Sequence, residues 1–152
     1  NINAYYEDGA IYITNQQTND MDMIDDIIHE IAHACEEMYM EQIYGDGKIV
    51  REFTAKRINL ANVLKDLYDL PKNFTHKVEY DQEIDQFLYK DVGYQILNQL
   101  CVGIFPSAYA ATSINEYFAR GFEEFFIGDR KNLKNTCQNL YRVLHSLVST
   151  ED

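Results

Sequence analysis

The chain contains the stretch His29-Glu30-Ile31-Ala32-His33, an H-E-x-x-H run near the start of a long helical segment, and the rest of the chain is interpreted around it. On a helix of about 3.6 residues per turn, His29 and His33 lie one turn apart, so both imidazoles can reach a single Zn²⁺. Glu30 lies about 100° round the same turn, which places a carboxylate beside the metal without making it a ligand. The run therefore predicts an active-site helix with His29 and His33 as zinc ligands and Glu30 as the general base.

The helix that carries this run is predicted to cover residues 20–43. Asn19 or Asp20 is its predicted N-cap, and Gly45-Asp46-Gly47 marks the turn that follows it. Its apolar residues form one stripe, made of Ile24, Ile27, Ile28, Ile31, Cys35 and Met38. The two histidines fall nearly opposite the centre of that stripe, so we expect the stripe to face the core and the histidines to face away from it. The alternative is that both histidines simply sit among acidic residues on a solvated helix face.

Segments on either side of this helix carry their own patterns. Residues 10–14 follow a turn signal at Asp8-Gly9 and are predicted to form a strand. Its edge could pair with an extended substrate through main-chain hydrogen bonds, or the strand could merely anchor the terminus. Apolar residues at helical spacing predict further helices over residues 49–70 and 82–101, with an irregular segment at residues 71–80 between them.

The C-terminal part of the chain is predicted to form two more helices. Ser113-Ile114-Asn115-Glu116 has the S-x-x-E form of a capping box, and the helix that it opens should end at Gly128. Asp129 should cap a last helix that runs through Leu147. These elements predict a single domain over residues 1–152, of the α+β class but mainly α-helical, with a small N-terminal sheet and the active-site helix.

The composition excludes several classes of protein. The formal net charge of −12 would repel phosphate, which argues against a nucleic-acid partner. No apolar run approaches the roughly 18 to 20 residues that a membrane-spanning helix needs. Cys35, Cys101 and Cys137 are odd in number and widely spaced, which favours buried free thiols over a C-x-x-C metal site or a disulfide scaffold. The twelve Tyr and eight Phe suit an aromatic core or a groove that holds an extended peptide.

A catalytic zinc site usually has three protein ligands, so a third is expected. The metzincin continuation of the motif fails because Glu36 and Tyr39 occupy its Gly and third His positions. Glu116 is the best candidate, since its position on the helical wheel faces away from the apolar stripe of its own helix. Two alternatives remain for Glu116, which could instead complete the capping box with Ser113 or pair with Arg120 at i+4.

Two blocks of the sequence resemble a known family. The first is His29-Glu30-Ile31-Ala32-His33-Ala34, similar to an H-E-x-x-H-A start. The second is Tyr109 followed by Asn115-Glu116-Tyr117-Phe118-Ala119-Arg120-Gly121-Phe122, similar to a Tyr placed seven residues before an E-[FY]-F-A-x-x-F helix. Both blocks resemble the metallopeptidase domain of anthrax lethal factor and its relatives, which include the secreted clostridial Pro-Pro endopeptidases.

This resemblance implies a zincin-like fold, one catalytic Zn²⁺, a peptide or protein substrate and secretion from the cell. It implies that Glu116 is the third zinc ligand and that Tyr109 assists at the substrate carbonyl. The chain departs from the family in having Ala32 where Gly is usual. The 82 residues between His33 and Glu116 also form a longer connection than in the family, so residues 45–100 are interpreted as a possible helical insertion that changes the substrate groove.

The residues therefore predict a zinc-dependent endopeptidase. A water activated by the metal would attack the peptide bond, with Glu30 as the general base and Tyr109 as the donor to the oxyanion. The alternative is a non-catalytic zincin-like module that binds zinc or another protein, although such a module has no use for Glu30 and Tyr109. A helical interaction protein without metal is a third possibility, which metal analysis would separate from the other two.

Overall fold

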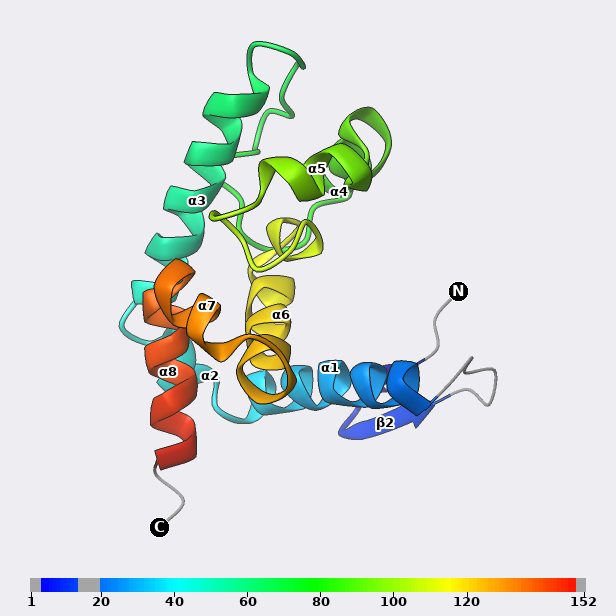
Figure 1. The fold of residues 1–152 in the computed structure, drawn as a ribbon, viewed down its shortest axis with the longest axis vertical. Helices are drawn as coiled ribbons and strands as arrows, with labels where there is room; N and C mark the ends of the chain where they lie inside the picture. Colours follow the sequence, from blue (N-terminus) through cyan, green and yellow to red (C-terminus); the bar gives the residue numbers. More distant parts are fainter. Residues whose placement is uncertain (1–3, 14–19, 150–152) are drawn as a thin grey trace.

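The computed structural model describes residues 4–13 and 20–149, and most of these residues belong to helices (Figure 1). The strands are β1 (Ala4–Glu7) and β2 (Ala10–Ile13). The first helices are α1 (Asp20–Met38), α2 (Met40–Tyr44), α3 (Lys48–Leu64) and α4 (Gln82–Gln86). They are followed by the π-helix η1 (Phe87–Val92), by α5 (Tyr94–Leu100) and by the 3₁₀ turn η2 (Tyr109–Ala111). The last helices are α6 (Ile114–Ile127), α7 (Arg130–Thr136) and α8 (Gln138–Ser149).

The strands form one antiparallel hairpin, and the predicted α+β class is wrong. Asp8 and Gly9 join the strands with φ values of 52° and 80°, the left-handed geometry that a tight hairpin turn requires. Two strands of four residues are too small to form a sheet layer, and no further strand occurs in the described ranges. The fold class of the described residues is therefore all-α. Thr14, the end of the predicted strand, and Asn19, one of the predicted caps, lie outside the described residues.

Helix α1 lies between α6 and the hairpin (Figure 1). The face that packs toward α6 is the histidine face, because Ala32 is fully buried and Glu36 is 5 % exposed. From the predicted apolar stripe, Ile28 and Cys35 pack against the core, but Ile31 and Met38 are exposed, as is Ile24. The predicted orientation of α1 is therefore wrong, and so is the alternative of a solvated histidine face. Burying polar groups on this face is tolerable only because they are paired with one another.

Several predicted helices are shorter or interrupted. The helix predicted over residues 20–43 breaks at Tyr39 and continues as α2, and the helix predicted over residues 49–70 ends at Leu64. Gly93, with φ 84° and ψ 139°, divides the helix predicted over residues 82–101. The last predicted helix is split at Cys137, between α7 and α8. The ends of α6 are as predicted, since Ser113 accepts a hydrogen bond from Glu116 N and Gly128 terminates the helix.

The buried Arg57 of α3 fixes the segment that leads into α6. It is 1 % exposed, and its guanidinium donates to four backbone carbonyls. The acceptors are those of Phe74 (2.6 Å), Ala111 (2.7 Å), Thr112 (3.0 Å) and Lys77 (3.3 Å). A guanidinium is suited to this role because its planar fork of donors can serve several acceptors at once. Arg57 thereby ties α3 to the turn η2 and to the N-terminus of α6.

Candidate metal centre

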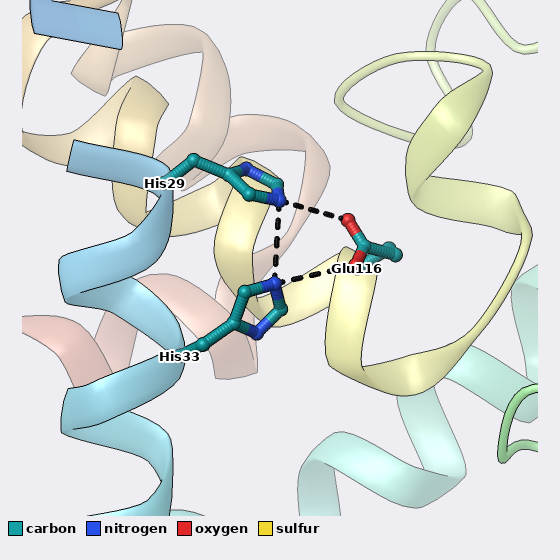
Figure 2. A group of neighbouring side chains, drawn as sticks. All are labelled: His29, His33 and Glu116. Carbon is teal, nitrogen blue, oxygen red and sulfur yellow. Dashed lines mark hydrogen bonds and ion pairs between the residues drawn. The ribbon is translucent and has the colours of Figure 1, made fainter. Parts of the chain in front are cut away.

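The candidate centre forms where α1 meets the first turn of α6. His29 and His33 lie one turn apart on α1, and Glu116 lies on α6 just after the cap that Ser113 provides. Figure 2 shows the two imidazoles pointing from α1 toward the Glu116 carboxylate. The packing of α1 on α6 thus brings together three residues that are far apart in the sequence, and these are the three predicted metal ligands.

The two Nε2 atoms and the Glu116 carboxylate group form a triangle in which each imidazole faces a different carboxylate oxygen. His29 Nε2 lies 3.0 Å from Glu116 Oε2, His33 Nε2 lies 3.3 Å from Glu116 Oε1, and the two Nε2 atoms are 3.2 Å apart. Zinc bonds of about 2.0 to 2.1 Å at tetrahedral angles place neighbouring ligand atoms about 3.3 Å apart. Each of the three separations is therefore close to that between neighbouring ligand atoms of a tetrahedral zinc site.

The other ring nitrogen of each histidine faces a carboxylate. His29 Nδ1 donates to Glu123 Oε1 at 2.6 Å, and His33 Nδ1 lies 3.6 Å from Glu36 Oε1. A carboxylate at Nδ1 favours the tautomer that carries its proton there, which leaves the Nε2 lone pair directed into the triangle. Both imidazoles are therefore oriented as metal-binding histidines usually are.

In the metal-free centre, protons take the place of a cation. Burial lowers the pKa of both imidazoles, but hydrogen bonds with carboxylates outweigh it and raise the pKa of His29 to about 9 and that of His33 to about 10. Burial raises the pKa of Glu116, but its hydrogen bonds with the two histidines dominate and lower it to about 2. Without a metal, the centre therefore holds its carboxylate ionised and attracts protons onto both imidazoles.

The donor set fits zinc. Oε2 of Glu116 is buried and faces His29 Nε2 at 3.0 Å, so when that nitrogen carries no proton, a cation would supply the partner that this oxygen then lacks. Two imidazole nitrogens and one carboxylate oxygen are also a usual ligand set of catalytic zinc, with a fourth position left for water. His29, His33 and Glu116 form the one group of three or more His, Cys, Asp or Glu side chains in the described ranges whose ligand atoms are close enough to hold an ion.

Glu30 lies beside the centre but outside the ligand group. Its side chain is 9 % exposed, and together with His33 and Glu36 it lines a hollow of about 340 Å³. A carboxylate next to the metal ligands and open to a hollow can receive a proton from a water there. Glu30 and the candidate ligand His33 therefore share one hollow, and the role of Glu30 as general base stays a prediction.

Tyr109 lies on another side of the centre. It begins the turn η2, its ring centroid is 6.5 Å from that of His29, and 44 % of its surface is exposed. Burial, and then the charge of Glu116, raises the pKa of Tyr109 to about 12, so its hydroxyl keeps its proton at neutral pH. Tyr109 and Glu116 both line a second cavity, of about 470 Å³. The tyrosine hydroxyl is thus available as a hydrogen-bond donor beside the centre.

The sequence reasoning missed the carboxylates that support the histidines. Glu123 lies two turns after Glu116 on α6, and that spacing was the available signal that both share one face. Arg120 donates to Glu123 Oε2 and to Ser107 Oγ, so Arg120 forms its ion pair with Glu123 and not with Glu116, as one of the two alternatives for Glu116 required.

Glu36 was considered only as a departure from the metzincin motif. It is nevertheless buried, and it accepts hydrogen bonds from Tyr44 and from Asn115 Nδ2, the latter at 3.0 Å. These bonds join α1 to α2 and to the first turn of α6. The remaining histidines, His76 and His145, are exposed and do not belong to the ligand group. Cys101 and Cys137 are buried free thiols, as predicted.

Comparisons with known proteins give no match to any family model, curated protein or solved structure. Within the described ranges, no helix has both the length and the apolar character needed to cross a membrane. The functional interpretation of the centre therefore depends on its geometry and on the residues that the sequence places there.

Proposed function

We propose that this chain is a zinc-dependent endopeptidase of the lethal-factor-like type. The observation that carries the proposal is the convergence of His29 Nε2, His33 Nε2 and the Glu116 carboxylate group, in which Oε2 lies 3.0 Å from His29 Nε2, Oε1 lies 3.3 Å from His33 Nε2, and the two Nε2 atoms are 3.2 Å apart. Two imidazole lone pairs and a carboxylate, all hydrogen-bond acceptors, converge there. Such an arrangement is favourable when a cation or protons lie between the acceptors.

In the proposed holoenzyme, His29, His33 and Glu116 hold the zinc. Bound zinc would supply a Lewis acid and lower the pKa of a water toward ~7. Glu123 would accept a hydrogen bond from His29 Nδ1, and Glu36 would attract the Nδ1 proton of His33, so that the Nε2 atoms of both rings point at the ion. Arg120 holds Glu123 in place through an ion pair.

Two further residues act on the substrate in this proposal. Glu30 removes the proton of the attacking water and later delivers it to the amine of the departing peptide, so one carboxylate serves as base and then as acid. Tyr109 donates a hydrogen bond from its protonated hydroxyl to the oxygen of the scissile carbonyl as negative charge develops on it. The hollow beside Glu30 and the cavity beside Tyr109 give solvent and substrate access from two sides.

Peptide digestion by the zinc-loaded protein tests the proposal. A proteome-derived peptide library is incubated with the wild-type protein and with Glu30→Gln, zinc content is measured, and the cleavage sites are read by mass spectrometry. We expect about one zinc per chain in both proteins, cleavage by the wild type, and a loss of at least about 10³-fold in the variant. Zinc binding without cleavage would support the non-catalytic zincin-like module instead. Cleavage that survives in Glu30→Gln would contradict the role of this residue.

A further inference from the structure

The second cavity, of about 470 Å³, is walled by tyrosines and adjoins the metal centre. Tyr80, Tyr89, Tyr94 and Tyr109 line it, and Glu116 lines it as well. The ring centroids of Tyr89 and Tyr94 are 5.7 Å apart, and those of Tyr94 and Tyr109 are 6.4 Å apart. Because Tyr109 in turn lies 6.5 Å from His29, a continuous row of rings leads from the cavity to the candidate zinc ligands.

These rings are unusually exposed for aromatic side chains. Tyr80 and Tyr89 each keep 58 % of their surface exposed, and Tyr109 keeps 44 %. Exposed aromatic residues that gather at a concave site mark a place where a ligand covers them. Except for Tyr109, the tyrosines come from the segment between the two predicted motif blocks, so residues 80–94 contribute a wall of the cavity that Glu116 also lines.

The charge of the cavity favours a positively charged ligand. Asp85 lines it, and Tyr80 donates a hydrogen bond of 3.3 Å to Asp85 Oδ2. None of the described lining residues is a Lys, Arg or His. The nearby Lys77 is paired with Asp81 at 3.2 Å, so it does not neutralise Asp85. An ammonium or guanidinium group would find both a carboxylate and the faces of tyrosine rings, the two partners that stabilise a cation.

We propose that this cavity is a specificity subsite that binds a Lys or Arg side chain of the peptide substrate, close to the bond that is cleaved. The inference rests on the proposed endopeptidase function for its substrate, and its binding test does not depend on cleavage. A purely apolar side chain would gain the ring contacts but would give the charge of Asp85 no cation to pair with, only its hydrogen bond from Tyr80. The formal net charge of −12 adds long-range attraction for a basic peptide.

Cleavage specificity gives the first test. In a library randomised around the cleaved bond, Lys and Arg should be enriched at one position. In matched peptides, replacing that Lys by norleucine should lower kcat/KM about tenfold. Asp85→Asn should lower kcat/KM for the Lys peptide by a similar factor, so that the preference for the Lys peptide over the norleucine peptide is lost. Glu83→Gln removes an exposed charge from the same helix without touching the cavity and should change neither. Enrichment of proline or of an apolar residue, with no effect of Asp85→Asn, would overturn the inference.

Binding of a small probe gives a test that needs no catalysis. Nα-acetyl-lysine amide and its norleucine analogue are titrated into zinc-loaded Glu30→Gln protein, and the tyrosine ring resonances are followed by NMR. The lysine compound should bind at least about fivefold more tightly, and Asp85→Asn should remove that difference. Equal binding of the two compounds would refute the subsite even if peptides are cleaved. Selective lysine binding by a protein that cleaves nothing would keep the subsite and refute the endopeptidase.

Discussion

The support that Glu123 gives to His29 leads to a specific prediction. In the structure, Glu123 Oε1 accepts from His29 Nδ1 at 2.6 Å, and its Oε2 pairs with Arg120. The carboxylate thus stands between two donors and accepts from both. Glu123→Gln keeps the size of the side chain but replaces one acceptor oxygen by an NH₂ group. Either His29 Nδ1 or the Arg120 guanidinium must then face this NH₂ group, which is itself a donor.

The expected magnitude follows from the burial of this pair. The Glu123 side chain is only 9 % exposed, so solvent provides little compensation for the donor that loses its acceptor. A buried donor left without an acceptor costs about 1 to 3 kcal/mol. Loss of an outer carboxylate of a metal-binding histidine typically lowers metal affinity about 10- to 100-fold, which corresponds to about 1.4 to 2.7 kcal/mol. We therefore expect the zinc Kd of Glu123→Gln to rise about 10- to 100-fold.

Competition with a chromophoric chelator at pH 7.5 measures this change. Glu124→Gln is a matched control, because it alters the next residue of α6, whose carboxylate accepts from Asp129 N at the end of the helix rather than in the centre. Its zinc Kd should stay within about twofold of that of the wild type. Equal zinc affinity for Glu123→Gln and the wild type would refute the view that Glu123 orients His29.

Four further predictions concern protons, catalysis and stability. The metal-free pKa values of His29 and His33 are about 9 and about 10, so zinc binding at pH 7 should release close to two protons. Zinc affinity should therefore fall about 100-fold per pH unit below pH 9. Calorimetry in buffers of different ionisation enthalpy will measure the proton release. Both pKa values are raised above 6.5, so the two histidines contribute their full stabilisation to the metal-free protein below about pH 6.5 and lose it as the pH rises through 9 to 10. A free energy of unfolding that stays constant over this pH range would contradict the pairing of the histidines with carboxylates. Tyr109→Phe should lower kcat about 10²-fold while zinc affinity changes less than about twofold, and an unchanged kcat would remove Tyr109 from the mechanism. Arg57→Met should cost about 3 to 5 kcal/mol in urea unfolding, because three buried carbonyls and one partly buried carbonyl lose their donor. A cost below about 1 kcal/mol would contradict its anchoring role.

Local signals in the sequence were sufficient where the chemistry is local. The spacing of His29 and His33 requires only a helix, and the Ser113 cap requires only the first turn of α6. The turn at Asp8-Gly9 likewise follows from residues that adopt positive φ. For this reason the positions of the candidate ligands on their helices could be predicted without knowledge of the tertiary structure.

The orientation of α1 could not be predicted in the same way. Its apolar stripe indicated a core-facing side, but α6 packs on the opposite side, where Ala32 permits close approach and Glu36 bonds to Asn115. The polar groups of this face are buried because partners on α6 satisfy them. A hydrophobic pattern predicts that polar residues are exposed, because burying them is costly. It carries no information about a hydrogen-bonding partner that is distant in sequence.

The break between α7 and α8 also depends on distant partners. Glu52 of α3 accepts from Asn139 N at 2.8 Å and from Leu140 N at 3.2 Å, so it caps the start of α8 from another helix. Lys56, one turn further along α3, donates to Thr136 O at 2.8 Å at the end of α7. With both helix ends satisfied from outside, the chain can turn at Cys137 without a Gly or Pro, and the local sequence gives no sign of it.

Zinc-edge X-ray absorption on the zinc-loaded protein tests the central claim most directly. The account predicts one zinc per chain with two imidazole nitrogens at about 2.0 to 2.1 Å and oxygen ligands at about 2.0 to 2.2 Å, and Glu116→Ala should lose an oxygen scatterer together with most of the affinity. A sulfur scatterer at about 2.3 Å, or a spectrum and affinity that Glu116→Ala leaves unchanged, would contradict the assignment of His29, His33 and Glu116 as the zinc ligands.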